Sequence, residues 1–304
     1  MSMFAAHEGK KKYVMARISG GLGNQLFTYA TMMKIADATG RKIVLDSSEY
    51  ALVRDRKFGL LDFAEPAESM RAGPVCRMLS RVSCILEHFG FMRTSACLIR
   101  IFGWKRFSFD VLRPFDEDKA EFASILECKS HVVYLTGCCQ RLPLIADRDS
   151  VRVAFAPVVE QQSTIGQGES VSIHVRRGDY LKIGGGAWAL GESYYKRAIA
   201  MIREKIAHPS WYVFSDDIAW CREAFVDLKG AVFVDGDVDH PYRDLLRMAQ
   251  CKHHVIANST FSWWGAYLSP HIGHVVYPNV WVAGVRTDLT GLMPEEWILA
   301  EVVD

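Results

Sequence analysis

The stretch SVSIHVRRGDY, residues 170–180, places two adjacent arginines, a glycine and an aspartate directly after a short apolar run. Such a run is typical of a buried strand. Arg176 and Arg177 therefore stand at a strand end, and Gly178 permits close approach of the backbone. A guanidinium group matches a phosphate with two parallel hydrogen bonds, so the pair predicts an anion site. In the alternative interpretation, one arginine pairs with Asp179 and the other is solvated.

The same order of elements continues through the C-terminal half of the chain. After the strand that ends at residue 175, four further apolar runs alternate with four segments of helical pattern. Strands that alternate with helices in this way predict a doubly wound parallel sheet. We expect strands at 211–215, 231–234, 253–258 and 274–278, and helices at about 193–206, 218–228, 242–251 and 261–269.

The N-terminal half begins with a similar unit. A strand is predicted at 13–18, followed by the glycine turn SGGLGNQ, a helix at about 26–39 and a strand at 41–46. Residues 47–125 lose the alternation and indicate loops and helices, and a strand returns at 131–137. This order of elements is the start of a second parallel sheet.

A polar stretch rich in glycine, serine and glutamine, residues 156–170, separates the two halves and is interpreted as a linker. We therefore predict an α/β protein of two Rossmann-like domains that face each other across a cleft. The expected domains are 1–158, which includes a helical insert, and 168–285. Residues 286–304 are expected to form a tail that packs back on the second domain.

Polar motifs follow five of the predicted strands. Ligands of open α/β sheets bind beyond the carboxyl ends of the strands, so these motifs predict one shared ligand cleft. The motifs are GGLGNQ (20–25), HVRRGDY (174–180), FSDD (214–217), DGDVDH (235–240) and NSTFSWWG (258–265).

The motif NST comes just before a predicted helix. The N–H groups of a helix start, together with the hydroxyls of Ser259 and Thr260, suit a phosphate. With the two arginines they predict a diphosphate clamp without a metal. The motif GGLGNQ lacks a complete phosphate-loop pattern, and it indicates a tight turn that directs Asn24 and Gln25 into the cleft.

The acidic motifs allow more than one interpretation. Asp216 and Asp217 offer carboxylates to a ribose hydroxyl or to the N–H donors of guanine. Alternatively, Ser215 or Asp216 caps the helix that follows. DGDVDH starts like a calcium loop but lacks its glycine and its last ligand, so a strand-end turn with a helix cap is favoured. A Mg²⁺–diphosphate site there stays an alternative.

Composition narrows the class of protein. The chain has 304 residues and a net charge of +1, which argues against a nucleic-acid binder. No apolar stretch is long enough for a signal peptide or a membrane-spanning helix. The eight cysteines lack metal-binding spacing and indicate buried, reduced thiols in a cytoplasmic protein.

Residues 70–107 are both basic and apolar. Seven arginines and lysines lie there among leucine, isoleucine, phenylalanine and tryptophan. The pattern is that of a helix at a membrane surface or of a partner face. The alternative is a helical insert that packs on its own domain.

Four motifs together resemble the bacterial α-1,2-fucosyltransferases of glycosyltransferase family 11. Their order and spacing fit over about residues 13–280. The resemblance implies a GT-B-type architecture, with the donor GDP-L-fucose in the C-terminal domain and a terminal β-galactoside as acceptor. It rests on GGLGNQLFTYA (20–30), HVRRGDY (174–180), FSDD (214–217) and NSTFSWWGAYLS (258–269).

The resemblance also implies roles for single residues. The family's arginine motif falls on Arg176 and Arg177, with Arg176 on the β-phosphate. Asn24 would reach the junction of fucose and phosphate from the N-terminal domain. The expected donor site comprises Gly23, Asn24, His174, Arg176, Arg177, Ser215, Asp216, Asp217, Asn258, Ser259, Thr260, Phe261 and Ser262.

Transfer from β-linked GDP-fucose to an α-fucoside inverts the anomeric carbon. Charge develops on the departing β-phosphate, where preorganised donors stabilise the transition state and make a metal optional. Asp179 is the first candidate for the base that takes the proton of the galactose 2-hydroxyl, and His174 is the second. With Arg176 and Asn24 they form the expected catalytic set. The alternative role of Asp179 is to orient Arg177 or to cap a turn.

Two other classes of function stay open. One is a GT-B glycosyltransferase with another nucleotide-sugar or linkage, and the other is a non-catalytic protein that binds a nucleotide-sugar or a glycan. A lipid-linked acceptor in O-antigen synthesis would place the protein at the inner face of the cytoplasmic membrane, with residues 70–107 on the lipid. The glycine-rich loop 181–193 is expected to close over the substrates. The sequence makes no prediction of oligomeric state.

Overall fold

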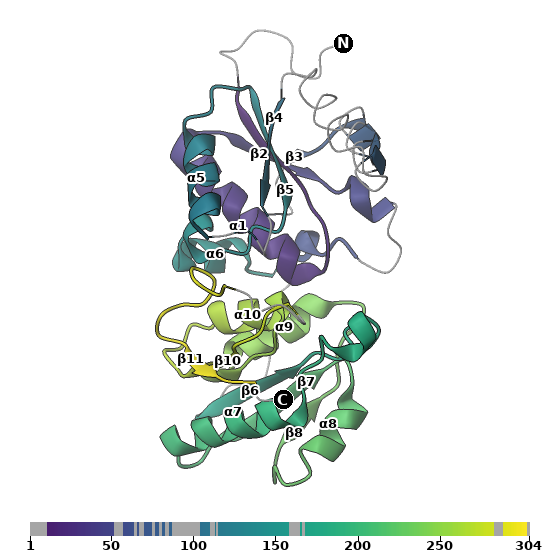
Figure 1. Cartoon of the computed structure of the whole chain (residues 1–304), viewed down its shortest axis with the longest axis vertical. Coiled ribbons are helices and arrows are strands. Elements are labelled where there is room, and N and C mark those ends of the chain that lie inside the picture. The colour runs from purple at the N-terminus through teal and green to yellow at the C-terminus, as the bar shows by residue number, and fades with distance from the viewer. Residues whose placement is uncertain are drawn as a thin grey trace. The chain divides into compact units, whose positions relative to one another are not determined.

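The chain forms two α/β units, Met1–Val158 and Val159–Asp304 (Figure 1). Within the part that the structure describes, each unit contains one sheet of parallel strands. The structure is a computed structural model. It describes residues 11–51, 57–63, 66, 70–74, 77–78, 81–82, 85–86, 104–109, 113, 115–157, 165, 168–282 and 288–302.

The sheet of the first unit has the strand order β3-β2-β1-β5-β4. All five residues of β1 are buried, as are the first five of β5, because these central strands are covered on both faces. Parallel register brings Arg17 opposite Asp46 where β1 and β2 end. The strands are β1 (Tyr13–Arg17), β2 (Lys42–Asp46), β3 (Met70–Arg71), β4 (Trp104–Phe109) and β5 (Val132–Gly137).

The expectation of only loops and helices in residues 47–125 is wrong. β4 lies in this region and pairs with β5 over six residues, from Trp104 to Phe109. Its buried positions are the first, fourth and sixth, so they do not alternate as the strand pattern requires. Gly137 ends the pairing with a φ of 86°, and a Cβ there would lie 1.9 Å from the Phe109 carbonyl oxygen. The same unit contains α5 (Phe115–Leu126) and α6 (Arg148–Ala154).

Helix α1 (Leu22–Thr39) begins four residues before its predicted start, inside the glycine motif. Gly20 has a φ of 70° and turns the chain from β1 into the helix. Gly40 ends the helix with a φ of 64°, and its N–H donates to the carbonyl of Ala36. Buried residues surround the first three turns, so α1 runs through the interior of the unit.

The second unit confirms the five predicted strands and four predicted helices of the C-terminal half. Its sheet has the order β11-β10-β9-β6-β7-β8. The strands are β6 (Ser170–Val175), β7 (Ser210–Ser215), β8 (Val232–Val234), β9 (His253–Val255), β10 (Val275–Pro278) and β11 (Ile298–Ala300). The helices are α7 (Glu192–Lys205), α8 (Ile218–Ala224), α9 (Pro241–Gln250) and α10 (Thr260–Tyr267).

The sixth strand of this sheet was not predicted. β11 comes from the C-terminal segment and pairs in parallel with β10, so that Ile298 lies opposite Val276. The described residues of the expected tail therefore contribute a strand to the sheet itself. Figure 1 shows β11 beside β10 in this unit.

The two faces of β6 differ in chemistry. Val171, Ile173 and Val175 are fully buried in the main core of the unit, where each contributes about 1.5–3 kcal/mol by burial. The alternate residues are polar and face the other side of the sheet. Ser172 lies there with its hydroxyl 2.8 Å from Nδ1 of His254. His174 lies on the same face, at the carboxyl end of the strand.

The described residues include five cysteines, which carry free thiols. Four of them are buried and Cys138 is half-buried. Burial raises the pKa of the Cys251 thiol to about 12. No helix among the described residues is long and apolar enough to cross a membrane.

Candidate functional site

The carboxyl ends of β6, β7 and β9 bring three of the sequence motifs to one edge of the second sheet. β6 lies between β7 and β9, and all three strands are parallel. The Arg177 N–H donates to Oδ1 of Asp216 at 2.8 Å. The Tyr180 hydroxyl donates to the carbonyl of Asn258 at 3.0 Å. HVRRGDY is therefore in direct contact with both FSDD and NSTFSWWG.

Arg176 lies between two carboxylates. Its Nη2 is 2.7 Å from Oδ1 of Asp179, and its Nη1 is 2.9 Å from Oδ2 of Asp216. Its guanidinium carbon is 5.7 Å from the centroid of the Tyr180 ring. Asp179 thus pairs with Arg176, whereas the sequence offered Arg177 as its structural partner. About a quarter of each of these three charged side chains is exposed, so the group is open to a ligand.

Arg177 is held by a carboxylate and by an aromatic ring. Its Nε donates to Oδ2 of Asp217 at 3.0 Å, and its guanidinium carbon lies 4.1 Å from the centroid of the Trp220 ring. This stacking favours a planar cation over a lysine ammonium. The second oxygen of Asp217 accepts from the Trp220 N–H at 3.2 Å and so caps α8. The cap was expected at Ser215 or Asp216, and Ser215 instead accepts from the Asp217 N–H.

Both aspartates of FSDD are therefore engaged by the two arginines. Gly178 is needed for this arrangement, because a Cβ there would come within 2.7 Å of Oδ2 of Asp216. A ribose hydroxyl or a guanine edge can still use the remaining lone pairs of the carboxylates. A phosphate that binds Arg176 must compete with Asp179 and Asp216 for its N–H groups.

His174 is a buried, neutral imidazole beside this group. Its exposed fraction is 5%, and its ring centroid lies 5.5 Å from that of Phe261. Burial lowers the pKa of His174 to about 4; nearby Asp216 opposes this shift and Arg176 adds to it. Nδ1 of His174 has no hydrogen-bonding partner in the described structure. It can therefore accept or donate a hydrogen bond when a ligand arrives.

The start of α10 supplies backbone donors at the same edge. Ser259 is the N-cap residue, is buried, and makes no capping hydrogen bond with its side chain. Thr260 and Phe261 follow in the first turn, partly exposed. The Ser262 hydroxyl is buried and lies 3.0 Å from the carbonyl oxygen of Ser259, so it faces its own helix turn. Ser259 and Thr260 thus stand at the helix end, where backbone N–H groups are free of helical partners.

Asn258 links this helix start to the loop after β6. Its Nδ2 donates to the carbonyl of Trp188 at 3.1 Å, while its Oδ1 is buried without a hydrogen-bonding partner in the described structure. The rings of Tyr180 and Trp188 meet edge to face at 5.5 Å. The predicted mobile loop, 181–193, is thus tied to the strand edge just before its start, through Tyr180, and near its middle, through Trp188. Its three glycines, 184–186, all have positive φ angles.

The two amides of the glycine motif in the first unit have different partners. Oδ1 of Asn24 accepts a hydrogen bond from Nε2 of Gln140 at 3.2 Å. Gln25 is fully buried, and its amide binds the backbone of Lys57 and Gly59. The prediction that Gln25 points into a cleft is therefore wrong, because its side chain fixes a neighbouring loop. Gly23 lies buried in the first turn of α1.

The sequence did not indicate Gln140. It follows β5, is 6% exposed, and bends back so that its N–H donates to the carbonyl of Cys138. β5 and β1 are neighbours in the sheet, which brings Gln140 to the start of α1. Only the strand order could have identified the pair, since 116 positions separate Gln140 from Asn24.

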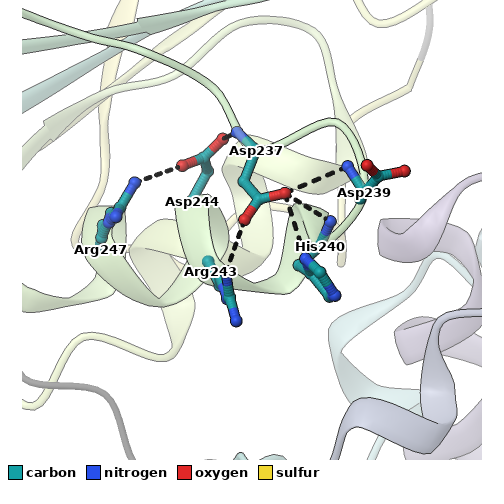
Figure 2. A network of polar contacts seen from close by, with 6 residues as sticks. All are labelled: Asp237, Asp239, His240, Arg243, Asp244 and Arg247. Atoms are coloured by element: carbon teal, nitrogen blue, oxygen red, sulfur yellow. Dashed lines mark hydrogen bonds and ion pairs between the residues drawn. The ribbon is translucent and has the colours of Figure 1, made fainter.

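The motif DGDVDH folds into a closed polar turn (Figure 2). One oxygen of Asp237 accepts from the N–H groups of Asp239 at 3.1 Å and His240 at 2.9 Å. Its other oxygen accepts from Nη1 of Arg243 at 2.8 Å. The Asp237 carboxylate is thus taken up by the backbone and by an arginine of α9.

The second carboxylate of this turn is engaged as well. Asp244 accepts from the Asp237 N–H at 2.9 Å and from Nη1 of Arg247 at 3.2 Å (Figure 2). Burial raises the pKa of Asp244, and these two contacts oppose the shift. The strand-end turn of the favoured interpretation is therefore present, but its helix cap is not, because His240 at the start of α9 makes no capping hydrogen bond with its side chain. No group of three or more His, Cys, Asp or Glu side chains in the described structure could hold a metal ion.

The model of glycosyl transferase family 11 matches residues 118–300, which is more than half of the chain. The chain belongs to glycosyl transferase family 11. The match includes β6, β7, β9 and α10, and thus every site residue of the second unit. It also includes Gln140, whereas the motif that carries Asn24 lies before it.

Two curated relatives extend over nearly the whole of this family 11 chain. An α-1,2-colitosyltransferase of Escherichia coli is 27% identical over 311 residues, covering 95% of this chain and 99% of the relative. The O-antigen biosynthesis glycosyltransferase WbnK of Escherichia coli is 28% identical over 315 residues, covering 92% and 98%.

The fold is also shared with a solved structure. FUT1 of Arabidopsis thaliana, a variant in complex with GDP, superposes with a TM-score of 0.53 at 14% identity. The likeness covers 89% of this chain and 71% of FUT1. It confirms the predicted GT-B-type fold, with two Rossmann-like sets of parallel strands.

Proposed function

We propose that this family 11 protein transfers L-fucose from GDP-β-L-fucose to the 2-hydroxyl of a terminal β-galactoside, with inversion at the anomeric carbon. The observation that carries the proposal is the position of Arg176. It lies at the carboxyl edge of the second sheet, beside the start of α10, with its guanidinium already oriented by Asp179 and Asp216. Such an edge binds nucleotides in doubly wound sheets.

The diphosphate would bind between Arg176 and the first turn of α10. The guanidinium offers two parallel N–H donors, and Ser259 and Thr260 add hydroxyl and backbone donors. Negative charge grows on the β-phosphate as the bond to fucose breaks, and these donors stabilise that charge. Removing one such donor costs about 3–4 kcal/mol of transition-state stabilisation. We propose that this field replaces a metal ion.

Asp179 is the base that the geometry favours. Its carboxylate is held 2.7 Å from Nη2 of Arg176, the same group that the phosphate would engage. Donor binding would then draw Arg176 away and release Asp179 to take the proton of the acceptor hydroxyl. The hydroxyl oxygen bonds to the anomeric carbon while that carbon's bond to the β-phosphate oxygen breaks, and GDP leaves.

His174 is the weaker candidate for this base. An imidazole whose pKa lies near 4 takes up protons poorly at neutral pH. Its place beside Phe261 and its unpartnered Nδ1 suit a hydrogen bond to the bound donor instead. In the first unit we propose that Asn24 contacts the transferred sugar.

A second candidate donor is GDP-colitose. The relative that aligns over 95% of this chain is an α-1,2-colitosyltransferase. Colitose is L-fucose without its 3-hydroxyl, so the two donors present the same diphosphate to Arg176. A site that hydrogen-bonds the 3-hydroxyl would reject colitose strongly, whereas an apolar site would discriminate weakly. The relative WbnK supports an O-antigen acceptor.

The decisive assay mixes purified protein with lactose and an equal amount of each GDP-sugar, in EDTA. Fucosyl-lactose with an α-1,2 linkage as the main product would support donor, linkage and metal independence together. A preference for colitose would assign the second donor. Neither product, with no release of GDP from either donor on a panel of β-galactosides, would contradict both proposals.

Asp179→Asn tests the base separately from the donor site. We expect binding of GDP, measured by calorimetry, to stay within a few-fold of wild type, while fucosyl transfer falls about a thousandfold. Asp237→Asn is the matched control, because Asp237 also pairs with an arginine at a strand end. Equal loss of transfer in both variants would mean that Asp179 is not the base.

A further inference from the structure

Tyr180 ends the motif that carries the two arginines, and the proposed reaction gives it no role. The chain turns back at this point, because the Leu181 N–H donates to the carbonyl of Arg177 at 2.8 Å. This hydrogen bond closes a turn of five residues. The backbone that carries Tyr180 is therefore held just beyond the end of β6.

The Tyr180 side chain contacts three separate parts of the site. The guanidinium carbon of Arg176 is 5.7 Å from the centroid of its ring, within the range of a cation–π interaction. Its hydroxyl donates to the carbonyl of Asn258 at 3.0 Å, in the residue before the N-cap of α10. Its ring meets the Trp188 ring edge to face at 5.5 Å. One half-buried side chain thus touches the arginine, the start of α10 and the loop 181–193.

Trp188 is held from a second direction. Its carbonyl accepts a hydrogen bond from Nδ2 of Asn258 at 3.1 Å. Tyr180, Asn258 and Trp188 therefore form a closed set in which each residue contacts the other two. The loop and the start of α10 cannot move apart without breaking a hydrogen bond of this set, so the set couples them.

We infer that Tyr180 is a positioning residue that sets the spacing between Arg176 and the start of α10 and links that spacing to the loop 181–193. The inference rests on the proposed function, since the diphosphate of the donor would bind between these two groups. The ring holds the guanidinium, and the hydroxyl holds the start of the helix. A ligand that bridges both groups depends on their spacing, because a misplacement of about 1 Å can cost about a hundredfold in rate.

Calorimetric titration of the whole protein with GDP tests the hydroxyl. Tyr180→Phe keeps the ring and removes the donor to Asn258, so the Kd for GDP should rise about three- to tenfold. Tyr194→Phe is the matched control, because the Tyr194 hydroxyl donates to the carbonyl of Ile256, two residues before Asn258, from the main core of the unit. The control should keep the Kd within twofold of wild type. Equal weakening in both variants would overturn the inference.

Tyr180→Leu tests the ring with the same titration. It should weaken GDP binding about two- to fivefold beyond Tyr180→Phe, because the cation–π contact with Arg176 is lost as well. A purely structural loss would lower the number of sites per chain and leave the Kd unchanged. That result, or equal Kd values for the two variants, would overturn the role of the ring.

Hydrogen exchange tests the link to the loop. GDP should slow exchange in the loop 181–193 of wild type, because a fixed start of α10 holds Asn258 and with it Trp188. In Tyr180→Leu, at saturating GDP, this slowing should be at least halved. Slowing of the same size in wild type and variant, or none in wild type with GDP bound, would overturn the link.

The titrations also separate this inference from the proposed function. No binding of GDP to wild type would overturn the proposed donor and the role of Tyr180 together. Binding of GDP to wild type, with the same Kd in both Tyr180 variants, would overturn the role of Tyr180 alone and leave the proposed donor supported.

Discussion

Gln140 donates a hydrogen bond from Nε2 to Oδ1 of Asn24 at 3.2 Å, and this contact requires the two amides to keep matching orientations. A flipped amide would set two N–H₂ groups against each other. The Asn24 amide also needs a glycine at position 20, because a Cβ there would lie 2.8 Å from Nδ2 of Asn24. The end of β5 and the turn after β1 thus orient one side chain together.

Replacing Gln140 should therefore lower transfer without loss of donor affinity. For Gln140→Leu we expect kcat to fall about tenfold, or about 1.4 kcal/mol, because Asn24 loses its orientation. KM for GDP-fucose should stay within twofold. In an Asn24→Ala background the same replacement should have no further effect on kcat, and an additive loss would contradict the positioning role.

Arg176→Lys should nearly abolish transfer and leave the fold intact. A lysine keeps one charge but loses the pair of parallel N–H donors, so kcat should fall by about 10²–10³. The melting temperature should change little, because the ion pairs of Arg176 are partly exposed. Arg243→Lys is the control, since Arg243 pairs with Asp237 at 2.8 Å outside the site. Near-normal transfer by Arg176→Lys would mean that Arg176 does not hold the diphosphate.

His174 predicts a dependence of stability on pH. Its folded pKa of about 4 lies below the ordinary value of about 6.5, so below pH 6.5 the unfolded state binds more protons at this position. The stabilisation that the neutral His174 imidazole gives to the folded state is fully present above pH 6.5. As pH falls from 6.5 to 4 it is lost, by up to about 3 kcal/mol.

The measurement compares urea unfolding of wild type and His174→Gln at several pH values. As pH falls from 6.5 to 4, the free energy of unfolding of wild type should decrease relative to that of the variant. Above pH 6.5 the difference between the two should stay constant. His208→Gln replaces an exposed histidine and should show no such shift. A constant difference for His174→Gln would mean that the folded protein accommodates the protonated imidazole.

Tyr134→Phe should destabilise the first unit. The Tyr134 hydroxyl donates to Oδ2 of Asp46 at 3.1 Å and accepts from Nε of Arg17, and all three side chains are buried. Removing the hydroxyl takes a donor from a buried carboxylate, at a cost of about 1–3 kcal/mol. Chemical unfolding followed by circular dichroism would show the loss. An unchanged midpoint would show that water replaces the hydroxyl.

The C-terminal half was predictable because its strands and helices alternate regularly from β6 to β10. Each element carries its own pattern, and parallel strands with helical crossovers leave few arrangements. β4 was missed because its buried positions do not alternate. β11 was missed because three residues carry too little pattern, and only its partner β10 makes them a strand.

Within the site, the sequence predicted where residues lie better than which residues they contact. Arg176, Asp216 and Asn258 lie at one sheet edge because they end neighbouring strands. Which carboxylate binds which arginine depends on side-chain directions that a sequence does not specify. Gln25 shows the same limit, since its polar amide serves the backbone of a loop 32 residues away.

The first sheet places β3 at one edge and β4 at the other, with the three remaining strands between them. The chain between β3 and β4 therefore enters and leaves at the two margins, and the central strands are complete without it. Lengthening such a connection is cheap, since doubling a loop costs only about 0.6 kcal/mol of closure entropy. A change in the length of this connection would therefore leave the pairing of β2, β1 and β5 intact.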